Sequence, residues 1–164
     1  MTTALTIEET FVVTALKSWE AWVGRADKFF ASLSDQQMQL EVAPGKNRAL
    51  YLLGHLTAVH DSMIPQLRLG EAEYPQLRET FIAQPDRAVS DLPSTAELRK
   101  YWKDVNLRLA SLFAELSPTQ WLERHGTVSE EDFAKEPHRN RLAILLSRTS
   151  HASYHLGQLL LLNK

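Results

Sequence analysis

The stretch S-H-A-S-Y-H-L-G-Q, residues 150–158, lies near the end of a helix predicted over about residues 138 to 162. Apolar residues recur there three and four positions apart, which is the period of a helix with one buried face. His151 and His155 therefore lie one above the other, beside the apolar side of that helix. Two such imidazoles can bind one metal ion. The glutamate of the protease motif H-E-x-x-H is missing, so that class is excluded.

A third ligand must come from elsewhere, and His55 in the motif L-L-G-H-L, residues 52–56, is the best candidate. It lines up with Val59 on the core-facing side of a helix predicted over about residues 47 to 67. Three neutral imidazoles leave the fourth position of a tetrahedral zinc ion open, which is typical of catalytic sites. Nickel, iron, manganese and cobalt accept the same ligands, so the pattern alone does not identify the metal.

Histidines four residues apart also occur without a metal, as half-buried side chains that hydrogen-bond their neighbours. From the spacing alone, both interpretations stay open. The remaining histidines have simple interpretations. We expect His60 to pack or to lie on the surface, with an outer partner of the metal ligands as the alternative. His125 falls in a predicted loop, and His138 opens the last predicted helix on another face.

Two further long helices are predicted from the same periodicity. The first covers about residues 7 to 33 and is capped by Thr6. The other starts at Ser94 or Thr95 and ends before Ser117, which is followed by proline. With the two histidine-bearing helices, these make four.

The connections contain turn residues and only short helical pieces. Residues 34–45 are predicted as a turn, and residues 69–93 as a long connection with a short helix at about 74–82. A connection this long crosses over the end of a bundle or covers a site. No strand-like alternation is found. We predict one all-α domain over residues 1–164, a four-helix bundle with a long crossover between its second and third helices.

Composition excludes several functions. The chain has 18 basic and 20 acidic residues, so the basic face expected of a nucleic-acid-binding protein is missing, as is a basic run for a membrane surface. It has no cysteine, so a metal site must use His, Asp or Glu. Residues 1–6 lack the charged and apolar regions of a signal peptide, and no apolar run is long enough to span a membrane. We expect a cytoplasmic protein.

The L-L-G-H-L motif, together with the terminal H-x-x-x-H-L-G-Q, resembles the DinB/YfiT-like family. The likeness covers nearly the whole chain, including the four helices and the long link between the second and third. The resemblance implies that three histidines hold a divalent metal, most often nickel or zinc, with iron or manganese as further options. By position these are His55, His151 and His155. Gln158 matches the family's ending and is a candidate outer partner or helix contact.

The resemblance also implies a function and an assembly. Characterised members include thiol transferases that use bacillithiol or mycothiol, and a glutathione-type isomerase. Members of the family are frequently homodimers. We therefore expect a metal-dependent enzyme that transfers a low-molecular-weight thiol to a small electrophile, or one that performs metal-assisted hydrolysis. The alternative is a non-catalytic stress-response or binding module, in which the metal ties the second helix to the last.

Three other side chains near the predicted site are candidates for orienting a substrate: Asp61, Arg148 and Tyr154. Each also has a simpler interpretation. Asp61 is expected to be a solvated charge, Arg148 to pair with an acidic side chain, and Tyr154 to pack.

Overall fold

The computed structural model describes residues 4–163. Residues 1–3, part of the segment for which no signal peptide is expected, lie outside the described residues. The described chain is helical and contains no strand, as predicted. Its four long helices are α1 (Ile7–Ser32), α3 (Ala49–Gln66), α4 (Thr95–Ala114) and α7 (Arg141–Leu159). Shorter pieces are α2 (Asp35–Met38), the π-helix η1 (Glu79–Ala83), α5 (Pro118–Trp121), α6 (Glu130–Lys135) and the 3-10 helix η2 (Leu160–Asn163).

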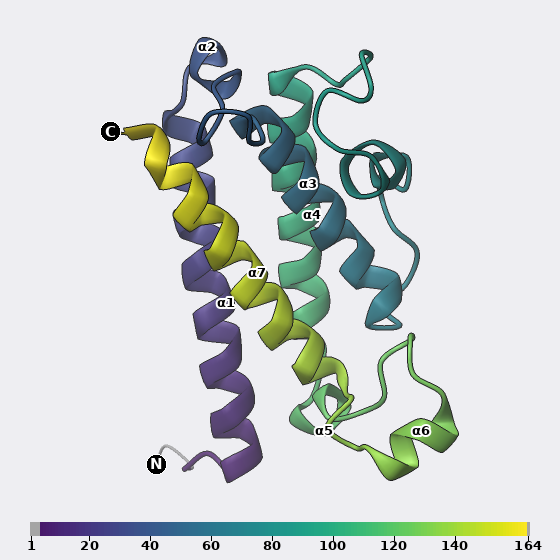
Figure 1. Ribbon diagram of the computed structural model, residues 1–164. Helices are drawn as coiled ribbons and strands as arrows, with labels where there is room; N and C mark the ends of the chain where they lie inside the picture. The colour runs from purple at the N-terminus through teal and green to yellow at the C-terminus, as the bar shows by residue number, and fades with distance from the viewer. Residues whose placement is uncertain (1–3, 164) are drawn as a thin grey trace.

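The long helices form two pairs. Helix α7 packs along α1, and α3 packs along α4. Figure 1 shows α7 crossing α1 at an angle, with the connection between α3 and α4 running from the lower end of α3 back up along its outer side. This connection is the predicted crossover, and it carries η1 against α3. Within residues 4–163, every helix is too short or too polar to cross a membrane.

Side-chain caps fix where the helices begin. The Thr6 hydroxyl accepts from the backbone of Glu9, while the Glu9 carboxylate accepts from the backbone of Thr6. Ser94 caps α4 with the same reciprocal pair of bonds. The prediction that the last helix opens at His138 is wrong, because the side chain of Asn140 caps the helix at Ala143 and leaves His138 exposed before it.

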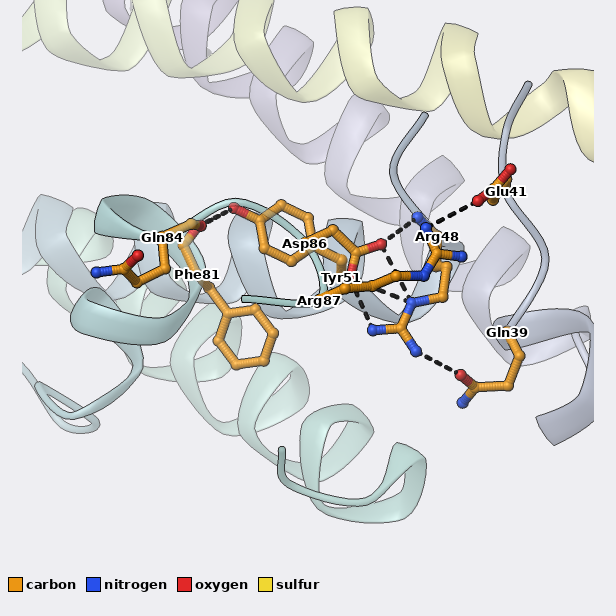
Figure 2. Close-up of polar contacts among 8 residues, drawn as sticks. All are labelled: Gln39, Glu41, Arg48, Tyr51, Phe81, Gln84, Asp86 and Arg87. Atoms are coloured by element: carbon orange, nitrogen blue, oxygen red, sulfur yellow. Dashed lines mark hydrogen bonds and ion pairs between the residues drawn. The ribbon is translucent and has the colours of Figure 1, made fainter. Parts of the chain in front are cut away.

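Residues far along the chain stabilise the start of α3. The helix was predicted to start at about residue 47, but it begins after Arg48, whose side chain makes no capping bond. The backbone N–H of Arg48 instead donates to Asp86 at 2.8 Å, and its guanidinium binds the same carboxylate at 2.7 Å. One turn further, the Tyr51 hydroxyl donates to the Gln84 carbonyl at 2.6 Å. These contacts, drawn in Figure 2, fasten the crossover to the first turn of α3, just before His55.

We expect Asp86→Ala to destabilise the protein by about 3 kcal/mol, because it leaves the largely buried Arg48 without its partner. Burial opposes ionisation of Asp86, but the hydrogen bonds and charge of Arg48 outweigh it and hold the pKa of Asp86 below its ordinary value of 3.8. A carboxylate whose pKa is lowered by folding stabilises the folded protein at pH values above its ordinary pKa. This stabilisation is lost as the pH falls through the lowered pKa.

Urea unfolding at several pH values measures both effects. The difference in stability between wild type and Asp86→Ala should be constant near neutral pH and should shrink below about pH 3.8. A difference that stays constant down to pH 2 would contradict this account of the ion pair.

Phe81 of η1 lies directly against Gly54 of α3. The Phe81 side chain is fully buried, and a Cβ added at Gly54 would meet its ring at 2.3 Å. Packing therefore explains the glycine in L-L-G-H-L, because only a residue without a side chain lets η1 approach the helix this closely. This approach sets the position of the backbone next to His55.

Candidate metal centre

The structure brings the three predicted histidines together. His55 comes from α3, whereas His151 and His155 lie one turn apart on α7. The Nε2 atom of His151 is 3.2 Å from that of His55 and 3.1 Å from that of His155. One nitrogen of each ring lies within 4.8 Å of the other two, so this group of three could hold a metal ion.

These distances suit a shared ion. Two imidazole nitrogens, each about 2.0 to 2.1 Å from a tetrahedral zinc ion, are about 3.3 Å apart. The two measured separations are slightly shorter than this value. All three donors are imidazole nitrogens, a set that suits zinc, nickel, copper and iron better than magnesium or calcium. The residues present therefore fit a divalent transition metal.

Outer partners set the tautomers of two rings. His55 Nδ1 lies 2.7 Å from the Phe81 carbonyl oxygen, which can only accept, so Nδ1 carries the proton. His155 Nδ1 lies 2.8 Å from the side-chain oxygen of Gln158, which fixes its proton in the same way. Both Nε2 atoms then present lone pairs toward His151. His151 Nε2 has at most one proton to donate when the ring is neutral, so it cannot donate fully to both, whereas a metal ion at this point could accept the lone pairs of all three nitrogens.

Burial favours the neutral form of all three imidazoles. Burial lowers the pKa of His151 to about 4, with further contributions from the other two imidazoles and from Arg148. Burial also lowers the pKa of His55, against the opposing bond to Phe81, and the pKa of His155, against the bond to Gln158. Neutral imidazoles are the form that binds metals, so protons do not compete for this site near pH 7.

The simpler interpretations of the nearby polar residues are largely wrong. Asp61 is 2% exposed and accepts hydrogen bonds from the backbone of Glu73 and Tyr74, so it anchors the start of the crossover. Tyr154 is 62% exposed and does not pack in the core, and its hydroxyl accepts from Gln158. Arg148 makes no ion pair within residues 4–163 and donates only to Gln66, at 3.3 Å. Neither Asp61 nor Tyr154 belongs to the cluster of three histidines.

The other histidines do not join the cluster. His60 is fully buried, with its ring 4.6 Å from Trp19 and 5.0 Å from Trp102, so it packs in the core as one of its predictions stated. Burial lowers its pKa to about 3. His125 lies in the predicted loop but is buried there, where its ring nitrogen accepts from the backbone of Thr127.

The sequence analysis did not identify two contributors to the site. The Phe81 carbonyl is a backbone group, and only the approach of η1 to Gly54 brings it to His55. The Tyr51 ring stacks on the His55 ring at a centroid distance of 6.2 Å and an interplanar angle of 12°. The spacing of Tyr51 and His55 was a signal for this contact, because residues four apart share a helix face. Gln158, the candidate outer partner, does contact His155.

Comparison with known proteins agrees with this arrangement. No curated protein matches the chain significantly. A family model described as the DinB superfamily matches residues 19–159, which include α3, α7 and all three clustered histidines. A match of this extent, together with the all-helical fold and a histidine cluster that could hold a metal, shows the family. The chain belongs to the DinB superfamily.

Proposed function

We propose that this protein is a metal-dependent enzyme in which His55, His151 and His155 hold a divalent cation, nickel or zinc before iron or manganese. The observation that carries the proposal is the convergence of three Nε2 atoms, two of them with their Nδ1 protons directed to fixed acceptors. This is the arrangement that orients imidazoles toward a metal in characterised sites.

The proposed reaction is transfer of a low-molecular-weight thiol to a small electrophile, with metal-assisted hydrolysis as the other option. A divalent ion held by three histidines supplies Lewis-acid chemistry, lowering the pKa of a coordinated water or thiol toward neutrality. The chain's own residues keep the imidazoles neutral, through burial, and keep their rings oriented, through Phe81 and Gln158. Three protein ligands leave a coordination position for the reacting molecule.

A metal-stabilised binding module is the second candidate. It is favoured by one observation: the cluster joins α3 to α7, so a bound ion would cross-link two helices that belong to different pairs. However, the crossover and the core around Phe81 already fix α3 without an ion. We therefore expect the metal to contribute more to activity than to folding. The homodimer and the cytoplasmic location stay predictions.

Metal removal separates the two candidates. Protein purified without a nickel column should contain about one equivalent of a divalent metal per chain, measured by elemental mass spectrometry. After chelation, we expect thiol transfer or hydrolysis to disappear and the melting temperature to fall by only a few degrees, because the core does not depend on the ion. A large loss of melting temperature, with no turnover of any thiol or ester by the loaded protein, would favour the binding module instead.

A further inference from the structure

Arg148 lies on α7, three residues before His151, and has no acidic partner among residues 4–163. We propose that Arg148 binds the carboxylate of a small anionic substrate and positions that substrate beside His55, His151 and His155. This inference rests on the proposed function, since it assigns a substrate class to the same site. It makes Arg148 a positioning residue and leaves the chemistry to the metal centre.

The location of Arg148 follows from helix geometry. It precedes His151 by three residues, so the two side chains emerge on the same face of α7. The Gln66 side chain, which accepts the hydrogen bond of Arg148, lies at the end of α3.

The hydrogen bonding of Arg148 is incomplete. Its Nη2 donates to Gln66 at 3.3 Å, a long bond to a neutral group, and its Nε is buried with no partner among residues 4–163. Other shielded arginines of this chain are paired. Arg48 binds Asp86 at 2.7 Å, and Arg141 binds Glu123 at 3.1 Å. Arg148 therefore departs from the pattern that the rest of the chain follows.

This departure points to a ligand. A guanidinium stays protonated at any physiological pH, so Arg148 cannot escape the cost of partial burial by becoming neutral. Burial does lower its pKa, and no neighbouring acid offsets the effect. An anion from outside would complete its hydrogen bonds, and a carboxylate matches the fork of the guanidinium with two parallel bonds.

A cavity next to Gln66 provides room for the substrate. Its volume is about 350 Å³, within the range of small-molecule sites. Its wall includes Ala58, Ser62 and Gln66, which follow His55 by three, seven and eleven residues and so lie on the same face of α3. The cavity and the histidine cluster thus lie along one face of α3, and Gln66 links the cavity to Arg148. Arg148 and the three histidines do not line the cavity themselves. The Asp61 carboxylate does line it, but both of its oxygens accept backbone hydrogen bonds.

A second cation offers a matched control. Arg78 lines this cavity directly, whereas Arg148 reaches it through Gln66, but Arg78 is exposed, so water can solvate its charge. If charge at the cavity alone mattered, Arg78 would serve as well as Arg148. We expect Arg148 and not Arg78 to matter, because the Arg148 guanidinium is partly buried and makes no ion pair among residues 4–163.

The first experiment needs neither metal nor activity. The ¹⁵N-coupled Nε–H signal of Arg148, identified by its loss in Arg148→Gln, is followed by NMR in metal-free protein. We expect 3-mercaptopropionate to shift this signal, 3-mercaptopropionamide to leave it unchanged, and Arg78→Gln to respond as wild type does. The proposal is overturned by an absent shift with the acid, by an equal shift with the amide, or by a shift that depends on Arg78.

The second experiment identifies which substrate carries the carboxylate. In cobalt(II)-loaded protein, thiol binding is read from the thiolate-to-cobalt absorption band. If the carboxylate belongs to the thiol, wild type and Arg78→Gln bind the acid about 10-fold or more tightly than the amide, and Arg148→Gln binds both equally. No preference in the wild type, together with a shifted NMR signal, assigns the carboxylate to the electrophile. Failure to take up cobalt counts against the proposed function, and the NMR result still decides the role of Arg148.

Discussion

Replacing His151 with alanine should weaken metal binding more than 100-fold. His151 is the centre of the cluster, with its Nε2 close to both of the other ligand nitrogens. Loss of an outer hydrogen-bond partner alone costs about 10- to 100-fold in metal affinity, so loss of a ligand should exceed that range. Competition with a coloured chelator at pH 7.5 measures the affinity, and elemental analysis measures the content.

Two further variants serve as comparisons for His151→Ala. Gln158→Ala removes the acceptor of the His155 Nδ1 proton and should weaken binding by about 10-fold, between wild type and His151→Ala. His138→Ala removes an exposed histidine before α7 and should leave affinity unchanged. Wild-type affinity in His151→Ala, or equal losses in His151→Ala and His138→Ala, would show that the ion is held elsewhere.

Gly54→Ala should destabilise the protein by about 2 kcal/mol or more, lowering the melting temperature by roughly 5 to 10 °C. The new methyl group would lie 2.3 to 2.6 Å from three atoms of the Phe81 ring. Phe81 is fully buried, so the ring has no open space to move into and η1 must shift as a unit. That shift would also move the Phe81 carbonyl away from His55, so metal affinity should fall with stability.

The contact itself is tested by a double-mutant cycle. Phe81→Ala alone should cost about 3 to 5 kcal/mol through the cavity it leaves. In Gly54→Ala/Phe81→Ala the methyl group no longer clashes, so the double variant should be more stable than the sum of the single losses predicts. Gly24→Ala is the matched control, because nothing lies within 4 Å of a Cβ there and alanine is the better helix former. If Gly54→Ala is as stable as Gly24→Ala, the steric account of the motif is wrong.

Much of the architecture could be predicted from residue periodicity. The long helices and the caps at Thr6 and Ser94 follow from local patterns, because capping residues and apolar spacing act within a few positions. The start of the second long helix was misplaced because a distant contact replaced a local cap. At Arg48, Asp86 takes the place of a local cap.

The sequence by itself determined the donor set of the site. Without cysteine, a metal centre had to use histidine or carboxylates, and the four-residue spacing of His151 and His155 aligned two imidazoles on one helix. The pairing of these two with His55, in the L-L-G-H-L motif, depends on how α3 meets α7. The fold brings them to the distance a shared ion requires, and their role as ligands stays a prediction.

Only the tertiary structure decided which groups surround that cluster. A backbone carbonyl of η1 orients His55, because Gly54 lets Phe81 approach, and no side-chain pattern records the position of a carbonyl. Within the described part of the chain, Arg148 has no acidic partner and Asp61 is buried, both against expectation. The charged residues of a helix can be identified from the sequence. Whether each charged side chain is paired, solvated or neither depends on contacts between residues far apart in the chain.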